Sequence, residues 1–86
     1  MGLDSVELVW DAEVAFGVDL PHSELASVRT VGDLHLAIMR HAGITPDTPA
    51  AAQAWERLVE VVVTSTGVPH ARVTPDAGIV DDLGIN

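Results

Sequence analysis

The side chains that could do chemistry in this sequence are its histidines, carboxylates and hydroxyls, since it contains no cysteine. No two histidines have the i, i+4 spacing of a helical zinc motif, and no serine lies in a nucleophile elbow. Asp76, Asp81 and Asp82 lack the spacing of an EF-hand loop. We therefore expect no metal site and no enzyme active site. The histidines are expected at the surface or at helix ends: His22, His35, His41 and His70.

Charge and composition exclude several classes of partner. Among 86 residues there are four Arg, no Lys and thirteen Asp plus Glu, so the formal net charge is −9. Nucleic acids and anionic membranes bind clustered positive charge, so neither is an expected partner. With 48% hydrophobic residues the chain is too apolar to be disordered. Only three aromatic residues are present, so the core should be mainly aliphatic, with Trp10 and Trp55 inside it.

No segment is long and apolar enough to predict a transmembrane helix, since Val61–Val63 and the other apolar runs are only a few residues long. The sequence Met1-Gly2-Leu3-Asp4 lacks the basic residues that open a signal peptide. A cytoplasmic protein is therefore expected.

Helix periodicity and capping residues predict three longer helices and one short turn. Thr30 and Asp33 have the spacing of a capping box, and Thr48-Pro49 supplies a cap followed by a first-position proline. Val59–Val63 has strand propensity, but the cap and the sustained period favour a helix. The helices are expected from Asp4 to Phe16, from Thr30 to Gly43 and from Thr48 to Gly67, with a turn at His22–Ser27.

The last twenty residues, from Gly67 to Asn86, contain two prolines and no periodic pattern. Such a long irregular segment is expected to pack on the helices through its own apolar residues. Those residues are Val73, Ile79, Val80, Leu83 and Ile85.

Several short motifs together resemble the acyl carrier protein family, but in a changed order. The first half of the chain is similar to the family's second helix through to its end. The second half is similar to its first helix and long first loop. The matching segments are Asp4–Val9, Phe16–Pro21, Thr30–Asp33, Trp55–Gly67, Val73–Ala77 and Asp81–Asn86.

This order is that of a circular permutation. The resemblance implies one all-α domain over residues 1–86, a small three- to four-helix bundle with a long loop. Residues 1–43 would form the family's second half, residues 49–86 its first, and linker 44–48 would join the family's old termini. A monomer is the simpler arrangement, and exchange of halves between two chains would give a domain-swapped dimer.

The resemblance implies a 4'-phosphopantetheine on a serine, and two hypotheses about that serine stay open. Family members carry the cofactor in a Gly-x-Asp-Ser sequence, which Gly2-Leu3-Asp4-Ser5 matches. Helix register, counted from Val6–Val9 and Phe16, instead places Gly2 at the attachment position, with Asn86 where the family has Asp. Either Ser5 carries the cofactor, or the chain has the carrier shape without the carrier serine.

The first hypothesis implies a noncatalytic carrier that holds an acyl or related group as a thioester. It would serve fatty acid, polyketide or secondary metabolite biosynthesis. The alternative is a serine-free interaction or regulatory protein that docks partner enzymes without a cofactor. In the carrier, the interior sheltering the acyl chain would be lined by Val9, Leu34, Ile38, Val59 and Val62.

An acidic stripe on the first helix is the expected docking surface. Asp4, Glu7 and Asp11 follow i, i+3, i+7 spacing and so share one face. Complementary charge speeds the docking of partners. The expected partners are basic surfaces of acyl-transferring or synthase enzymes, and a phosphopantetheinyl transferase.

Overall fold

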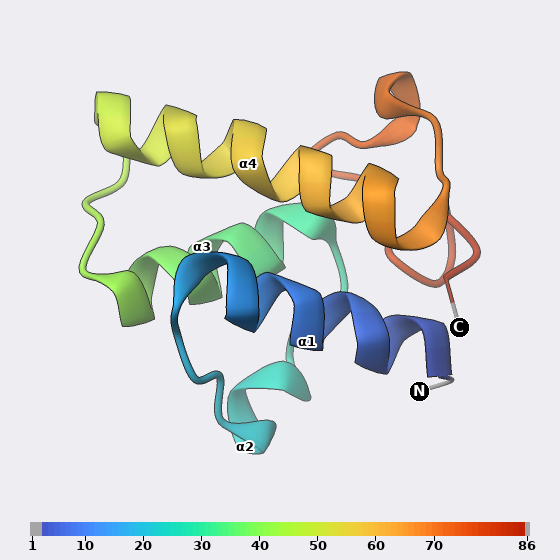
Figure 1. Ribbon diagram of the computed structural model, residues 1–86, viewed down its shortest axis with the longest axis horizontal. Coiled ribbons are helices and arrows are strands. Elements are labelled where there is room, and N and C mark those ends of the chain that lie inside the picture. The colour runs from blue at the N-terminus through green and yellow to red at the C-terminus, as the bar shows by residue number, and fades with distance from the viewer. Residues whose placement is uncertain (1–2, 86) are drawn as a thin grey trace.

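The computed structural model describes residues 3–85, with side chains from Ser5 onward, and these residues form a small all-α fold (Figure 1). Within the described residues the only β pairing is an isolated bridge between Thr30 and Gly78. The predicted fold class, all-α with three to four helices, is confirmed. The elements are α1 (Leu3–Phe16), α2 (His22–Leu25), α3 (Val31–Ala42), α4 (Pro49–Thr66) and a 3-10 turn (His70–Arg72).

The helices begin and end where the capping residues predicted. Thr30 Oγ1 accepts a hydrogen bond from Asp33 N at 3.0 Å, and Asp33 Oδ2 accepts one from Thr30 N at 3.2 Å. This reciprocal pair is a complete capping box for α3. At α4 the cap is one-sided: Thr48 Oγ1 accepts a hydrogen bond from Ala51 N at 3.2 Å. Gly43 and Gly67 end these helices with positive φ angles of 71° and 77°, which glycine adopts at little cost.

Helix α4 runs opposite to α1 and α3, as the chain colouring in Figure 1 shows. Each of the three packs against the other two. The connection from α3 to α4 lies at one end of the bundle, and the beginning of α1 lies at the other (Figure 1), where Ser5 lines a cavity together with residues 79–81. None of the described helices is long and apolar enough to cross a membrane.

The core is aliphatic, and its largest fully buried side chains come from three helices: Leu8, Val31, Leu34, Ile38, Leu58 and Val62. Trp55 is partly buried against this core. The prediction that Trp10 is a core residue is wrong, because 66% of it is exposed. Leu8 and Ala12 form the inner face of α1, and Trp10 lies on the opposite side of the helix.

The irregular segment after α4 packs on the helices as predicted, with one exception. Val73, Leu83 and Ile85 are buried in the core cluster together with Ile79. Ile79 is fixed by its backbone, since its N donates to Arg29 O at 2.8 Å and its O accepts from Ile85 N at 3.0 Å. Val80 was expected to pack as well, but that prediction is wrong, because Val80 lies in the turn formed by residues 79–83 and is 51% exposed.

The segment also contacts the beginning of α3. Val31 N donates to Ala77 O, and Gly32 N donates to Pro75 O, both at 3.0 Å. A Cβ on Gly32 would lie 2.7 Å from Pro75 O, well inside van der Waals contact. Glycine at this position therefore lets the loop reach two of the free N–H groups of α3.

Candidate functional site

Ser5 lies in the first turn of α1 and lines an apolar cavity of about 220 Å³. The cavity is bounded by residues from α1, from α2 and the turn after it, and from the C-terminal segment. The lining residues are Ser5, Leu8, Val9, Leu25, Val28, Arg29, Ile79, Val80 and Asp81. Of the five residues expected to line a sheltering interior, only Val9 borders this cavity. The other four are packed in the core: Leu34, Ile38, Val59 and Val62.

Ser5 is itself buried, with 4% of the residue exposed. A transferase needs direct access to the serine hydroxyl, so a cofactor could join Ser5 only after the first turn of α1 moves. Gly2 and Asn86, on which the alternative register depends, lie outside the described residues.

The predicted acidic stripe lies on the outer side of α1. Glu7 and Asp11 are both exposed, and Asp11 Oδ2 accepts a hydrogen bond from Ser65 Oγ of α4 at 2.8 Å. The side chain of Asp4 lies outside the described residues. The structure thus places two of the three predicted docking carboxylates on one accessible face.

An apolar stripe runs beside those carboxylates and was not predicted. Val6, Trp10 and Val14 are 46%, 66% and 74% exposed, and they follow one another at i, i+4 and i+8. Residues at this spacing share one face of a helix. The spacing is readable in the sequence, but it became informative only once the opposite face of α1 was known to be buried.

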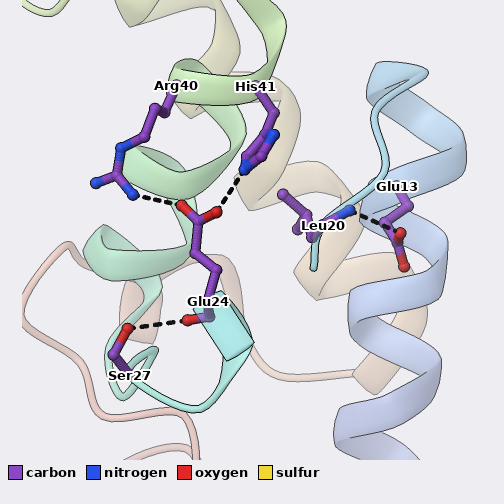
Figure 2. Close-up of polar contacts among 6 residues, drawn as sticks. All are labelled: Glu13, Leu20, Glu24, Ser27, Arg40 and His41. Atoms are coloured by element: carbon purple, nitrogen blue, oxygen red, sulfur yellow. Dashed lines mark hydrogen bonds and ion pairs between the residues drawn. The ribbon is translucent and has the colours of Figure 1, made fainter. Parts of the chain in front are cut away.

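A groove between α1 and α2 borders the apolar stripe. It has a volume of about 320 Å³, and most of its walls are apolar. Its lining residues are Val6, Val9, Trp10, Glu13, His22, Leu25 and Ala26. Glu13 Oε2 accepts a hydrogen bond from Leu20 N at 3.0 Å, which ties the chain leaving α1 back onto the helix (Figure 2).

Helix α2 is attached to α3 by a polar cluster that sequence reasoning missed. The two carboxylate oxygens of Glu24 contact Arg40 and His41 in the last turn of α3 (Figure 2). The hydrogen bond from His41 and the nearby charges of His41 and Arg40 lower the pKa of Glu24 below its ordinary 4.5. His41 lies at a helix end as expected, and its partner comes from α2, which no local pattern indicates.

The expectation that His35 lies at the surface or at a helix end is wrong, because His35 lies inside α3 and is partly buried against α4. His35 Nε2 is 3.0 Å from the backbone oxygen of Ala51, and the His35 ring meets the Trp55 ring edge-on at 5.4 Å between centroids. In the part of the chain that the structure describes, no group of three or more His, Cys, Asp or Glu side chains is placed to hold a metal ion.

No protein-family model, curated protein or solved structure among those compared with this chain matches it.

Proposed function

We propose that this chain is an acyl-carrier-like protein that holds an acyl or related group on phosphopantetheine and presents it to partner enzymes. The observation that carries the proposal is the apolar cavity beside Ser5. A carrier needs a sheltered apolar volume next to the position that bears its cofactor. Here the cavity adjoins the first turn of α1, which contains Leu3, Asp4 and Ser5 of the Gly-x-Asp-Ser sequence.

The arrangement of the chain supports the permuted order of motifs. Ile79, Val80 and Asp81 line the same cavity as Ser5, so the C-terminal segment lies against the N-terminal turn of α1. In a carrier of ordinary order, the long loop would continue into this helix at that place. Linker 44–48 then takes the place of the family's old termini, at the other end of the bundle (Figure 1).

A second candidate function is favoured by the burial of Ser5. A serine that is 4% exposed is a poor substrate for a transferase. The second candidate is therefore a carrier-shaped protein that docks partner enzymes through α1 and bears no cofactor. Both candidates share the docking surface and differ in the modification.

Intact mass after incubation with coenzyme A, Mg²⁺ and a phosphopantetheinyl transferase tests the proposal. The carrier hypothesis predicts a gain of one phosphopantetheinyl group, absent in Ser5→Ala and retained in Ser23→Ala, a matched control at an exposed serine. Circular dichroism would check that each variant is folded.

A Gly2→Ser variant separates the two candidates. It restores a serine at the position that helix register assigns to the attachment site. Modification of Gly2→Ser together with an unmodified parent chain, across several transferases, would overturn the carrier function and leave the docking protein.

A further inference from the structure

We propose that linker 44–48 is a hinge through which two copies of this chain exchange their second halves, so that residues 79–81 of one copy complete the cavity beside Ser5 of the other. The exchanged units are the first half, residues 3–43, and the second half, residues 49–85. This inference goes beyond the proposed function and holds for both of its candidates, since neither depends on which copy supplies the wall of the cavity.

The boundary between the two halves runs through the hydrophobic core. Buried residues of α1 and α3 pack against those of α4 and the C-terminal segment in a single cluster. Hydrogen bonds cross the same boundary: Ile79 N donates to Arg29 O, and Ser65 Oγ donates to Asp11 Oδ2, both at 2.8 Å. One half alone would expose its share of the core to water, so each half needs a second half to fold against. That second half can belong to the same chain or to another copy.

The linker that joins the halves is short and conformationally strained. It has five residues and turns the chain between the antiparallel helices α3 and α4 (Figure 1). Asp47 has a φ of 63°, and in the described part of the chain no other residue except glycine has a positive φ. This left-handed conformation costs a residue with a Cβ more than it costs glycine. Short hinge loops under strain favour the exchange of halves between chains.

An open linker can carry α4 away from α3. Five extended residues span up to about 17 Å, which exceeds the roughly 8–10 Å between the axes of packed helices. The contacts between a first and a second half are the same in the closed chain and in an exchanged pair. The balance between the two forms therefore depends on the linker and on protein concentration.

The exchange would change who builds the cavity beside Ser5. Its walls come from both halves, since α1, α2 and the turn after α2 supply one side and Ile79, Val80 and Asp81 supply the other. In an exchanged pair each of the two cavities is lined by both copies. Neither copy would have a complete cavity until its partner is in place.

Cysteine cross-linking tests the exchange, because the chain contains no cysteine of its own. One preparation carries Asp11→Cys and a second carries Ser65→Cys, at the hydrogen-bonded pair from different halves. The two are mixed in urea, refolded together at low and at high protein concentration, and oxidised. Mass spectrometry then measures the disulfide between the two preparations, whose yield should rise with concentration.

A matched control measures collisions between folded chains. Ala52→Cys, also exposed on α4, replaces Ser65→Cys and lies about 20 Å further along the helix at 1.5 Å per residue. The Asp11–Ser65 pair should give several-fold more mixed disulfide than the Asp11–Ala52 pair. Equal yields of the two pairs at every concentration would overturn the proposal.

Linker variants test the hinge itself by sedimentation velocity. Asp47→Gly relieves the positive φ and should lower the dimer fraction by several fold. Asp19→Gly, at an exposed loop position without a positive φ, is the control and should leave that fraction unchanged. Equal dimer fractions for Asp47→Gly and the parent chain would overturn the hinge.

Deletion of residues 43–47 removes the closed form. It leaves one residue between α3 and α4, fewer than the two to five residues that join antiparallel helices. The deletion variant should therefore be a dimer at concentrations where the parent chain is a monomer. A folded, monomeric deletion variant would contradict the proposal, and if circular dichroism shows that the variant is unfolded, the cross-linking yield decides. No cofactor enters these measurements, so their outcome is independent of the intact-mass experiment.

Discussion

Helices α1 and α3 have similar lengths and both run opposite to α4, yet their ends and outer faces differ. Helix α3 begins with a complete capping box and ends in Gly43, with Arg40 and His41 of its last turn bound to Glu24. Helix α1 has no basic residue in its last turn and exposes Val6, Trp10 and Val14. The polar groups of α3 are used within the fold, whereas the outer face of α1 leaves apolar area open to solvent.

The difference separates residues that stabilise the fold from residues available to a partner. Contacts of α3 link α2, α4 and the C-terminal segment, so changes there should alter the free energy of unfolding. The outer face of α1 makes few contacts within the chain, so changes there should alter binding.

The largest expected effect comes from a buried residue of α3. Leu34 is fully buried, and Leu34→Ala should lower the free energy of unfolding by about 2–5 kcal/mol through lost burial and a cavity. Trp10→Ala removes a larger side chain, but it should change the free energy of unfolding by no more than about 0.5 kcal/mol, because Trp10 is exposed. Urea unfolding followed by circular dichroism measures both. Similar losses for the two variants would contradict the distinction between the helices.

A smaller effect is expected where α3 meets the C-terminal segment. Gly32→Ala should lower the free energy of unfolding by about 1–3 kcal/mol, because its Cβ would collide with Pro75 O. At an open position inside a helix, the same change stabilises by about 0.5–1 kcal/mol. The sign of the change in stability therefore decides whether the loop contacts α3. A gain in thermal stability would show that the loop is not held against α3 in solution.

The smallest expected effect is a dependence on pH. Backbone hydrogen bonds from Arg29 and Thr30 lower the pKa of Asp33 below its ordinary 3.8, as the α2–α3 contact lowers that of Glu24 below 4.5. A lowered pKa in the folded state contributes stability that is present above the unfolded value and lost as pH falls toward the folded value. The free energy of unfolding should therefore decrease as pH falls below about 5.

Glu24→Gln isolates one part of that dependence. The variant should be less stable than the parent chain at pH 7, and the difference should narrow as pH is lowered from 7 toward 3, because Glu24 of the parent then becomes progressively protonated. Glu56→Gln, at an exposed position on α4, serves as the control. A stability difference that stays constant between these pH values would show that the carboxylate charge of Glu24 does not hold α2.

Helix positions could be predicted from the sequence because the capping signals are local. Thr30 and Asp33, or Thr48 and Pro49, act within one turn of the helices they begin. Which face of α1 packs against the other helices could not be predicted in the same way. It carries apolar residues on several sides, including Val6, Leu8 and Trp10, so periodicity alone does not say which side the other helices will cover.

Contacts between distant residues were also beyond sequence reasoning. Nothing near Glu24 indicates that it will meet Arg40 and His41, sixteen and seventeen residues away. The cavity beside Ser5 likewise needs residues from both ends of the chain. The motif at Gly2–Ser5 could be found from its letters, but the burial of Ser5, which is 4% exposed, arises only once the chain is folded.

The linker between α3 and α4 is a suitable place to insert a label. Thr45, Pro46 and Asp47 are exposed, and the linker lies at the end of the bundle away from the first turn of α1 (Figure 1). Exposed loops of this kind tolerate inserted sequence. A dye, an epitope or an immobilisation tag inserted there would report on the protein without crowding the cavity beside Ser5, which lies at the other end of the bundle.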